Sequence, residues 1–346
     1  MAEALSGHAR AVATIVTYHF VQPAMAGPLA GLKRLDLAAF REQLTYIRRH
    51  YTPVSVFDLA RAAGDASALP PRPIVLSFDD GYRGHFHHVL PLLDSLSIPA
   101  VFFPVASPLL DRRVLDVNKI QCVLAAADDV GRLVAAIETA IGRHRHQAGL
   151  PAPAEYREKW WRPSRWDPPA VVYVKRLLQH ALPEPIRRPL LDGLFRELVS
   201  DDEAAFADQF YMSVGEARGL RAAGMTVGAH GDRHLRLPTL SREDQASEID
   251  GALRVLDAVE VPRQRFVYCY ANGEYDNDSV DLLRARGCSV AFTTRPDLAH
   301  IAVDDMLTLP RIDANDLPVR SDAEPNEWTR RAAALSDAGA GSTSDP

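Results

Sequence analysis

The sequence predicts an α/β fold, a (β/α) barrel that is interrupted by a large helical insertion. Two apolar, β-prone segments at 74–78 and 225–229 lead directly into polar residues, Asp79 in the first case and His230 in the second. Such segments alternate with helix-like segments on both sides of a long stretch that has no clear strand. Repeated β–α units favour a parallel sheet or barrel, and seven or so strands fit a barrel better than an open sheet.

The first half of the barrel contains three predicted strands, at 12–20, 73–78 and 100–105, which are rich in Val, Ile, Leu and Phe. Asp36 is predicted to cap the helix that follows the first strand. The apolar positions of that helix follow helical spacing: Leu37, Phe40, Leu44 and Ile47. The next helix shows the same spacing: Phe86, Val89, Leu92, Leu93 and Leu96.

The second half repeats this alternation. Its predicted strands lie at 225–229, 265–270 and 289–294, with one more at 306–312. Its predicted helices lie at 213–223, after the capping residue Ser241, and at 277–286.

Between the two halves, residues 109–210 are predicted to be helical and are broken by many prolines. The chain is therefore divided into four parts: barrel at 1–108, a helical insertion or lid at 109–210, barrel at 211–320 and a flexible tail at 321–346. The tail is assigned from its Ala, Ser, Asp and Gly content.

Composition restricts the class of protein. An apolar fraction of 47% and a charged fraction of 24% are ordinary for a soluble globular chain. The net charge is −6 and no basic stripe is present, which argues against a nucleic-acid partner. The three cysteines are widely spaced, so a disulfide framework is not expected. Residues 1–10 lack a signal-like pattern, and we expect a cytoplasmic protein without stable membrane insertion.

Two carboxylates and a His-x-x-x-His pair mark the two strand ends. Asp79 and Asp80 follow one apolar segment, and His230 and His234 follow the other. Functional groups collect at strand ends in β/α folds. Two imidazoles and one carboxylate suit a Zn²⁺-like ion, and the second carboxylate is then available as a base. Each motif alone is often only a turn, a helix cap or a surface feature. Together they predict metal-assisted hydrolysis.

These motifs resemble a known family. Ser-Phe-Asp-Asp-Gly-Tyr at 77–82 resembles the first motif of the polysaccharide deacetylases, the NodB-homology or carbohydrate esterase 4 group, and His-Gly-Asp-Arg-His at 230–234 resembles the second. Phe-Val-Tyr-Cys-Tyr-Ala-Asn-Gly at 266–273 is similar to the third, with Ala271 where the family has a proline. The resemblance covers roughly 12–107 and 211–313.

The resemblance implies a deformed (β/α)7 barrel and a metal-dependent hydrolase that removes an N-acetyl group from an amino sugar. It implies that Asp79 is the general base. The implied metal ligands are Asp80, His230 and His234. The ion would be Zn²⁺ or, alternatively, Co²⁺, Mn²⁺ or Ni²⁺. The backbone around Tyr270 would help to stabilise the oxyanion. The candidate substrate contacts on the barrel are Tyr82, Tyr270 and Asn272.

The general acid follows a different pattern from many family members, which have a Leu-x-His motif near the end of the barrel. This chain has Leu-Thr-Leu-Pro-Arg-Ile-Asp at 307–313, but Thr-Tyr-His at 17–19 is similar to branches with a permuted motif order. His19 is therefore the candidate acid, and a buried histidine bonded to backbone is the alternative. Arg311 is a candidate partner that keeps Asp79 ionised, or else forms a structural ion pair elsewhere.

In the insertion, Trp160, Trp161 and Trp166 lie among several arginines. Aromatic faces stack on sugar rings and arginines bind phosphates, so Trp161 is a candidate substrate contact in a lid for a sugar nucleotide or a lipid-linked sugar. Packing of the subdomain is the alternative. Asp232 is either a partner of a ligand histidine or an exposed turn residue.

Two other functions remain open at this point. The atypical third motif leaves room for a deformylase or another amidase on the same scaffold. The missing C-terminal histidine leaves room for a catalytically decayed sugar-binding protein.

Overall fold

The structure is a computed structural model that describes residues 12–65 and 69–340. The chain divides into two compact units. The first comprises Met1–Pro23, Arg34–Arg112 and Asp208–Pro346, and the second comprises Ala24–Lys33 and Arg113–Ala207. Residues 1–10, for which the sequence predicts no signal-like pattern, lie outside the described residues.

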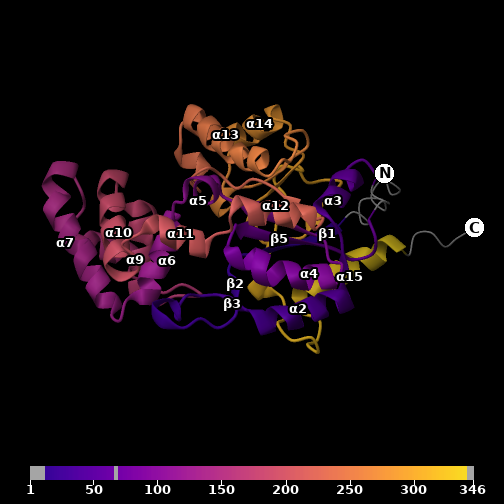
Figure 1. Cartoon of the computed structure of the whole chain (residues 1–346), viewed down its shortest axis with the longest axis horizontal. Coiled ribbons are helices and arrows are strands. Elements are labelled where there is room, and N and C mark those ends of the chain that lie inside the picture. Colours follow the sequence, from indigo (N-terminus) through magenta and orange to yellow (C-terminus); the bar gives the residue numbers. More distant parts are fainter. Residues whose placement is uncertain (1–11, 66–68, 341–346) are drawn as a thin grey trace, which may run out of the picture. The chain divides into compact units, whose positions relative to one another are not determined.

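The first unit is built on parallel strands that lie among its helices (Figure 1). The pairings of these strands close into a ring. The strands of the ring are β1 (Val12–Tyr18), β5 (Pro73–Asp80), β6 (Ala100–Pro104), β7 (Thr226–Val227), β8 (Val267–Cys269), β9 (Val290–Phe292) and β11 (Ile312–Asp313). Parallel pairing joins β11 to β1, β1 to β5, β5 to β6, β6 to β7 and β8 to β9. Two parallel bridges complete the ring, Ala229 with Tyr268 and Phe292 with Leu309. The predicted deformed barrel of seven strands is confirmed.

Other elements of this unit surround the ring. The remaining strands are β2 (Val21–Gln22), β3 (Leu35–Asp36), β4 (Thr52–Pro53) and β10 (Ala299–His300). The helices are α2 (Leu37–His50), α3 (Val56–Ala62), α4 (Leu90–Ser95), α5 (Ala106–Asp111), α12 (Val214–Ala222), α13 (Arg242–Ala258), α14 (Asn277–Ala285) and α15 (Glu327–Ala340). Asp36 caps α2 as predicted, because its side chain accepts a hydrogen bond from the Ala38 amide at 2.8 Å.

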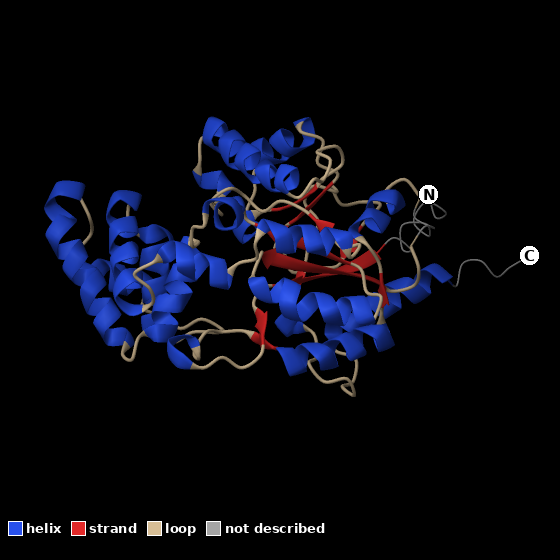
Figure 2. Cartoon of the chain, in the orientation of Figure 1, coloured by secondary structure: helices blue, strands red, loops and turns tan. Residues whose placement is uncertain are grey.

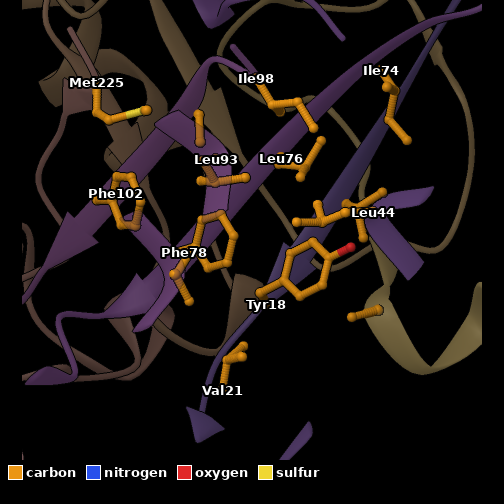
Figure 3. Close-up of a cluster of buried hydrophobic side chains, with 14 of the residues drawn as sticks. Tyr18, Val21, Leu44, Ile74, Leu76, Phe78, Leu93, Ile98, Phe102 and Met225 are labelled. Carbon is orange, nitrogen blue, oxygen red and sulfur yellow. The ribbon is translucent and has the colours of Figure 1, made fainter. Parts of the chain in front are cut away.

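Alternation along β5 gives the barrel an outer and an inner face. Ile74, Leu76 and Phe78 belong to the core under helices such as α2, α4 and α12 (Figure 3), whereas Val75 belongs to a second cluster inside the ring. Successive side chains of a strand point to opposite faces. Asp79 therefore continues the inward series of Val75, and this position decides its partners.

The outer core is organised by stacked aromatic rings. The Phe78 ring stacks on Tyr18 of β1 at a centroid distance of 4.8 Å and on Phe102 of β6 at 4.9 Å, as Figure 3 shows. Offset stacking of aromatic rings adds to the stabilisation that burial provides. These three stacked rings hold β1, β5 and β6 together just before Asp79 and Asp80 at the end of β5.

In the second unit, every described regular element is a helix (Figure 2). They include α6 (Asp116–Ala126), α7 (Val130–Ala148), α8 (Pro153–Trp160), α9 (Pro169–Arg176) and α10 (Glu184–Leu198), and α11 (Glu203–Phe210) leads back to the first unit. The buried Lys119 ammonium lies 2.6 Å from Asp192 and 2.9 Å from Glu203, which ties α6 to α10 and α11. No helix in the described ranges is long and apolar enough to cross a membrane.

The tail differs from its prediction. Residues 321–346 were expected to be flexible, but Glu327–Ala340 forms α15. The buried Thr329 hydroxyl lies 2.7 Å from the Tyr46 hydroxyl and accepts a hydrogen bond from Tyr51 at 2.9 Å. Ala332 packs into the outer core. An alanine-rich sequence is also a good helix former, and here tertiary contacts hold it. Residues 341–346 lie outside the description.

Candidate metal centre and its flanking acid–base groups

The ring brings the predicted base, acid and metal ligands to the carboxyl ends of its strands. Asp79 and Asp80 end β5, His19 follows β1 and His230 lies three residues beyond β7. Arg311 directly precedes β11. In parallel β/α barrels the loops at this edge carry the functional groups.

Asp80, His230 and His234 form a compact set of possible metal ligands. The Asp80 Oδ1 atom lies 3.6 Å from His230 Nε2 and 3.6 Å from His234 Nε2. Asp80 and His230 are buried, and Oδ1 has no hydrogen-bond partner among the described residues. A buried carboxylate oxygen without a partner is unfavourable unless a cation or donor satisfies it. Two imidazole nitrogens and one carboxylate oxygen are a donor set that fits a divalent ion such as Zn²⁺.

Neighbouring groups orient two of these ligands. The Tyr82 hydroxyl donates to Asp80 Oδ2 at 2.7 Å, which leaves Oδ1 directed at the histidines. His230 Nδ1 lies 2.8 Å from the Cys269 carbonyl oxygen. A carbonyl can only accept, so Nδ1 carries a proton. Burial lowers the pKa of His230, but the nearby acidic groups outweigh burial and raise it, and a metal would replace the second proton at Nε2.

The backbone conformation of the two loops is unusual. Asp80 and Gly81 have φ of 71° and 72°, and His234 has φ of 61°. The left-handed region is uncommon for residues other than glycine. At Gly81 a Cβ atom would also lie 2.7 Å from the Pro104 Cβ atom, so only glycine fits. Strained conformations of this kind persist where surrounding contacts fix them, often at functional sites.

Asp79 points into the barrel and is held by Arg311. Arg311 Nη1 donates to Oδ1 at 2.9 Å and Nη2 donates to Oδ2 at 2.7 Å. The Thr17 hydroxyl donates to Oδ2 at 3.2 Å, and the Cys269 thiol lies 3.5 Å from it. Burial raises the pKa of Asp79, but the Arg311 guanidinium and the neighbouring His230 imidazole together outweigh burial, and the net pKa lies well below its usual range. Asp79 is therefore a carboxylate at neutral pH.

His19 lies beside this carboxylate. Its Nε2 atom is 3.9 Å from Asp79 Oδ2, and its side chain is about half exposed (48%). The alternative of a buried histidine therefore does not hold for His19, although it does for His85. His85 Nε2 lies 2.6 Å from the His19 carbonyl oxygen. Burial lowers the pKa of His85 to about 4, so a neutral His85 imidazole donates to that carbonyl.

His234 is partly buried and lies next to the His230 imidazole. Burial and the adjacent His230 ring lower the pKa of His234 to about 4. A lowered pKa favours the neutral imidazole, which is the form that binds metals. The His234 side chain is therefore electrostatically suited to the role implied for it.

Two predicted substrate contacts are corrected by the structure. Tyr270 is fully buried, its hydroxyl donates to the Leu307 carbonyl at 2.9 Å and its amide donates to the Phe292 carbonyl at 3.1 Å. Neither its ring nor its own amide is left for a substrate or an oxyanion. Tyr82 is 2% exposed, and its hydroxyl supports Asp80 instead. Residues with a β-prone aromatic pattern fill a barrel core as readily as they line a site.

The other predicted residues, Asn272, Trp161 and Asp232, do not contact the candidate metal ligands through any described hydrogen bond. Asn272 is exposed, with φ of 57°, and its carbonyl accepts from the Thr294 hydroxyl. Trp161 belongs to the second unit, is 40% exposed and stacks with the Arg157 guanidinium at 4.6 Å. Asp232 Oδ1 accepts from Arg254 at 2.6 Å.

Three residues around the site were not predicted: Ser77, Thr293 and Glu248. Arg311 also donates from Nη1 to the Ser77 hydroxyl at 3.0 Å and from Nε to the Thr293 carbonyl at 2.9 Å. Glu248 of α13 accepts from two amides of the loop that carries His234. Ser77 has a sequence signal, because it shares the inward face of β5 with Asp79. Glu248 has only the weak signal of a carboxylate next to the apolar face of its helix.

Comparison with known proteins agrees with this geometry. The family model described as "Polysaccharide deacetylase" matches residues 66–147 and 206–291. The matched ranges contain Asp79, Asp80 and both histidines but not His19 or Arg311. They extend further into the helical insertion than the sequence motifs indicated.

Two kinds of relative support the match. The poly-beta-1,6-N-acetyl-D-glucosamine N-deacetylase of Escherichia coli strain K12 is 39% identical over 71 residues, which is 20% of this chain and only 11% of that protein. The fold is similar to Streptococcus pyogenes deacetylase PplD, solved in complex with acetate, with TM-score 0.54, 14% identity and coverage of 89% of this chain and 93% of that one. It is also similar to IcaB from Ammonifex degensii, with TM-score 0.52, 15% identity and coverage of 94% and 97%.

At such identities the solved structures establish the fold alone, and the motifs and the family model carry the assignment. The matched ranges contain both motifs that supply the candidate metal ligands, and the barrel edge brings those motifs together. Over these two ranges the chain matches the polysaccharide deacetylase family.

Proposed function

We propose that this chain is a metal-dependent hydrolase that removes an N-acetyl group from an amino sugar. One observation carries the proposal: the unpartnered Oδ1 atom of Asp80 faces His230 and His234, and a second carboxylate, Asp79, lies on the neighbouring residue. Ligands and base are thus separate groups at one strand end. This separation favours metal-assisted amide hydrolysis, because coordination to the ion would lower the basicity of a carboxylate that also had to accept the proton.

A divalent ion held by Asp80, His230 and His234 would polarise an acyl oxygen and lower the pKa of a water molecule. The remaining work falls to the protein. Asp79 accepts a proton from the attacking water as its oxygen forms a bond to the acyl carbon. Arg311 fixes both carboxylate oxygens of Asp79 and keeps the group ionised for this step.

His19 completes the reaction. The carbon–nitrogen bond breaks when the departing amine receives a proton, and His19 is the half-exposed acid beside Asp79. His85 binds the backbone carbonyl of His19, which fixes the backbone from which the His19 imidazole extends. The products are acetate and a free amino sugar.

The similarity to an enzyme named for poly-β-1,6-N-acetyl-D-glucosamine makes a β-1,6-linked oligosaccharide the first substrate to test. N-acetylated sugar nucleotides and lipid-linked sugars remain in the proposed class, with the exposed Trp161 as a candidate contact in the second unit. Location in the cytoplasm stays a prediction.

The test compares the wild type with Asp79→Asn and with the exposed control Asp201→Asn. We measure bound metal and released acetate on β-1,6-linked oligomers, chitin-type oligomers and sugar nucleotides. Asp79→Asn should keep its metal and lose about 10²–10⁴-fold in rate, the usual contribution of a general base. Asp201→Asn should match the wild type. Release of formate instead of acetate would favour a deformylase, and sugar binding without turnover would favour a decayed binding protein.

A further inference from the structure

Glu248 is a buried carboxylate that the proposed reaction does not use. It lies on α13 with 2% of its surface exposed. Its Oε1 atom accepts hydrogen bonds from the Arg233 amide at 2.8 Å and from the Leu235 amide at 3.2 Å. These two amides flank His234 on either side, so one carboxylate oxygen holds the backbone on both sides of a candidate metal ligand.

The conformation of His234 explains why this contact is possible. With φ of 61°, the residue is left-handed. A left-handed residue next to right-handed backbone turns neighbouring amides to the same side and creates a small anion-binding concavity. Here the anion comes from the protein itself. The conformation is unfavourable for a histidine, and two hydrogen bonds to a carboxylate offset that cost.

The loop also wraps closely around this oxygen. Gly231 has φ of 82°, and a Cβ atom there would lie 3.0 Å from Glu248 Oε1. Further contacts hold the start of the loop: Ala106 and Ser107 of α5 donate to the Gly231 and Asp232 carbonyls at 3.2 and 2.8 Å. Glu248 is the contact that acts at His234.

We propose that Glu248 is a positioning residue that fixes the backbone of His234 so that its imidazole faces Asp80 and His230. This inference rests on the metal centre proposed above. The role depends on the length of the side chain. The carboxylate of a glutamate extends far enough from α13 to accept from both amides, whereas the carboxylate of a shorter side chain does not. Groups that orient metal ligands typically change metal affinity about 10–100-fold when they are removed.

The experiment separates reach from charge. Glu248→Gln keeps the length and an acceptor oxygen, and Glu248→Asp keeps the charge but withdraws the carboxylate by one methylene. Glu243→Asp is the matched control, because Glu243 lies on the exposed side of the same helix. Zn²⁺ affinity is measured by chelator competition, folding by thermal unfolding of the metal-free protein, and the loop by hydrogen exchange of the Arg233 and Leu235 amides.

The expected result is a roughly 10–100-fold loss of Zn²⁺ affinity in Glu248→Asp, with faster exchange of both amides. Glu248→Gln and Glu243→Asp should stay within about threefold of the wild type, well below the effect of a lost orienting group. Unchanged affinity in Glu248→Asp overturns the positioning role alone. An equal loss of Zn²⁺ affinity in Glu248→Gln also overturns it, because the length of the side chain would then not determine the affinity. A wild type that binds no Zn²⁺ overturns the metal centre and this role together.

Discussion

Arg311 and Asp79 form a two-pronged salt bridge that is almost completely closed to solvent. The two guanidinium–carboxylate contacts measure 2.9 and 2.7 Å, and the side chains are 0% and 2% exposed. The pair lies at the inner edge of the barrel, next to the candidate metal ligands. Its arrangement leaves neither charge without a partner, which is what makes a carboxylate tolerable at this depth.

Arg311→Met should destabilise the protein strongly. The change leaves Asp79 as a buried charge without a counterion, and breaking a buried pair from one side costs about 3–5 kcal/mol. Urea unfolding measures the loss. Arg320→Met is the control, because Arg320 pairs with Asp322 on the surface, and it should leave the unfolding free energy unchanged. If Arg311→Met is as stable as the wild type, the pair does not hold the barrel edge.

His85 should make stability depend on pH in a mildly acidic window. Its pKa is about 4 when folded, against an ordinary value of 6.5. Between these values the unfolded chain binds a proton that the folded chain does not, so the unfolding free energy falls as the pH is lowered from about 6.5 towards 4. At about 1.36 kcal/mol per pKa unit the contribution is on the order of 3 kcal/mol.

The measurement is the unfolding free energy from pH 7 to pH 4 with a chelator present. His85→Gln should reduce this dependence and leave the share that His234 contributes through its own lowered pKa, whereas His87→Gln should leave the dependence unchanged, since His87 is exposed. Parallel curves for the wild type and His85→Gln would show that another group is responsible.

Much of the barrel and the site follows from local patterns in the sequence. The apolar, β-prone segment at 74–78 predicts the strand, and the end of that strand predicts where Asp79 and Asp80 lie. Because side chains alternate, adjacent carboxylates reach different partners, Arg311 inside the barrel and the histidines at its edge. The pairing of Asp79 with Arg311 was one of two alternatives, and the structure shows it.

What the sequence did not predict depends on contacts between distant segments. The hydrogen bond that the Arg233 amide donates to Glu248 depends on how α13 is oriented about its own axis, and helical spacing in the sequence defines this orientation only roughly. The burial of Tyr270 depends on closure of the ring near Leu307. The association of Ala24–Lys33 with the helical unit likewise has no local signal, because a short connection rich in Ala and Gly looks the same in either unit.

Zn²⁺ should stabilise the folded protein through the three proposed ligands. A ligand that binds only the folded state at a hundred times its Kd raises the unfolding free energy by about 2.7 kcal/mol. Thermal unfolding with and without Zn²⁺ measures this shift. His230→Ala should abolish it, and His144→Ala, an exposed histidine of the second unit, should retain it. A shift that survives in His230→Ala would place the ion elsewhere.

His19 should matter only when the leaving group needs a proton. An amine departs from an N-acetyl sugar as a poor leaving group, so His19→Ala should lower kcat/KM for that substrate about 10²–10⁴-fold. The 4-nitrophenolate of 4-nitrophenyl acetate leaves as a stable anion without protonation. For this ester His19→Ala should change the rate by no more than about threefold, because general acid catalysis contributes little there. Asp79→Asn, which removes the base, should lower both rates. If His19→Ala lowers both equally, His19 acts through Asp79 or the loop and does not protonate the amine.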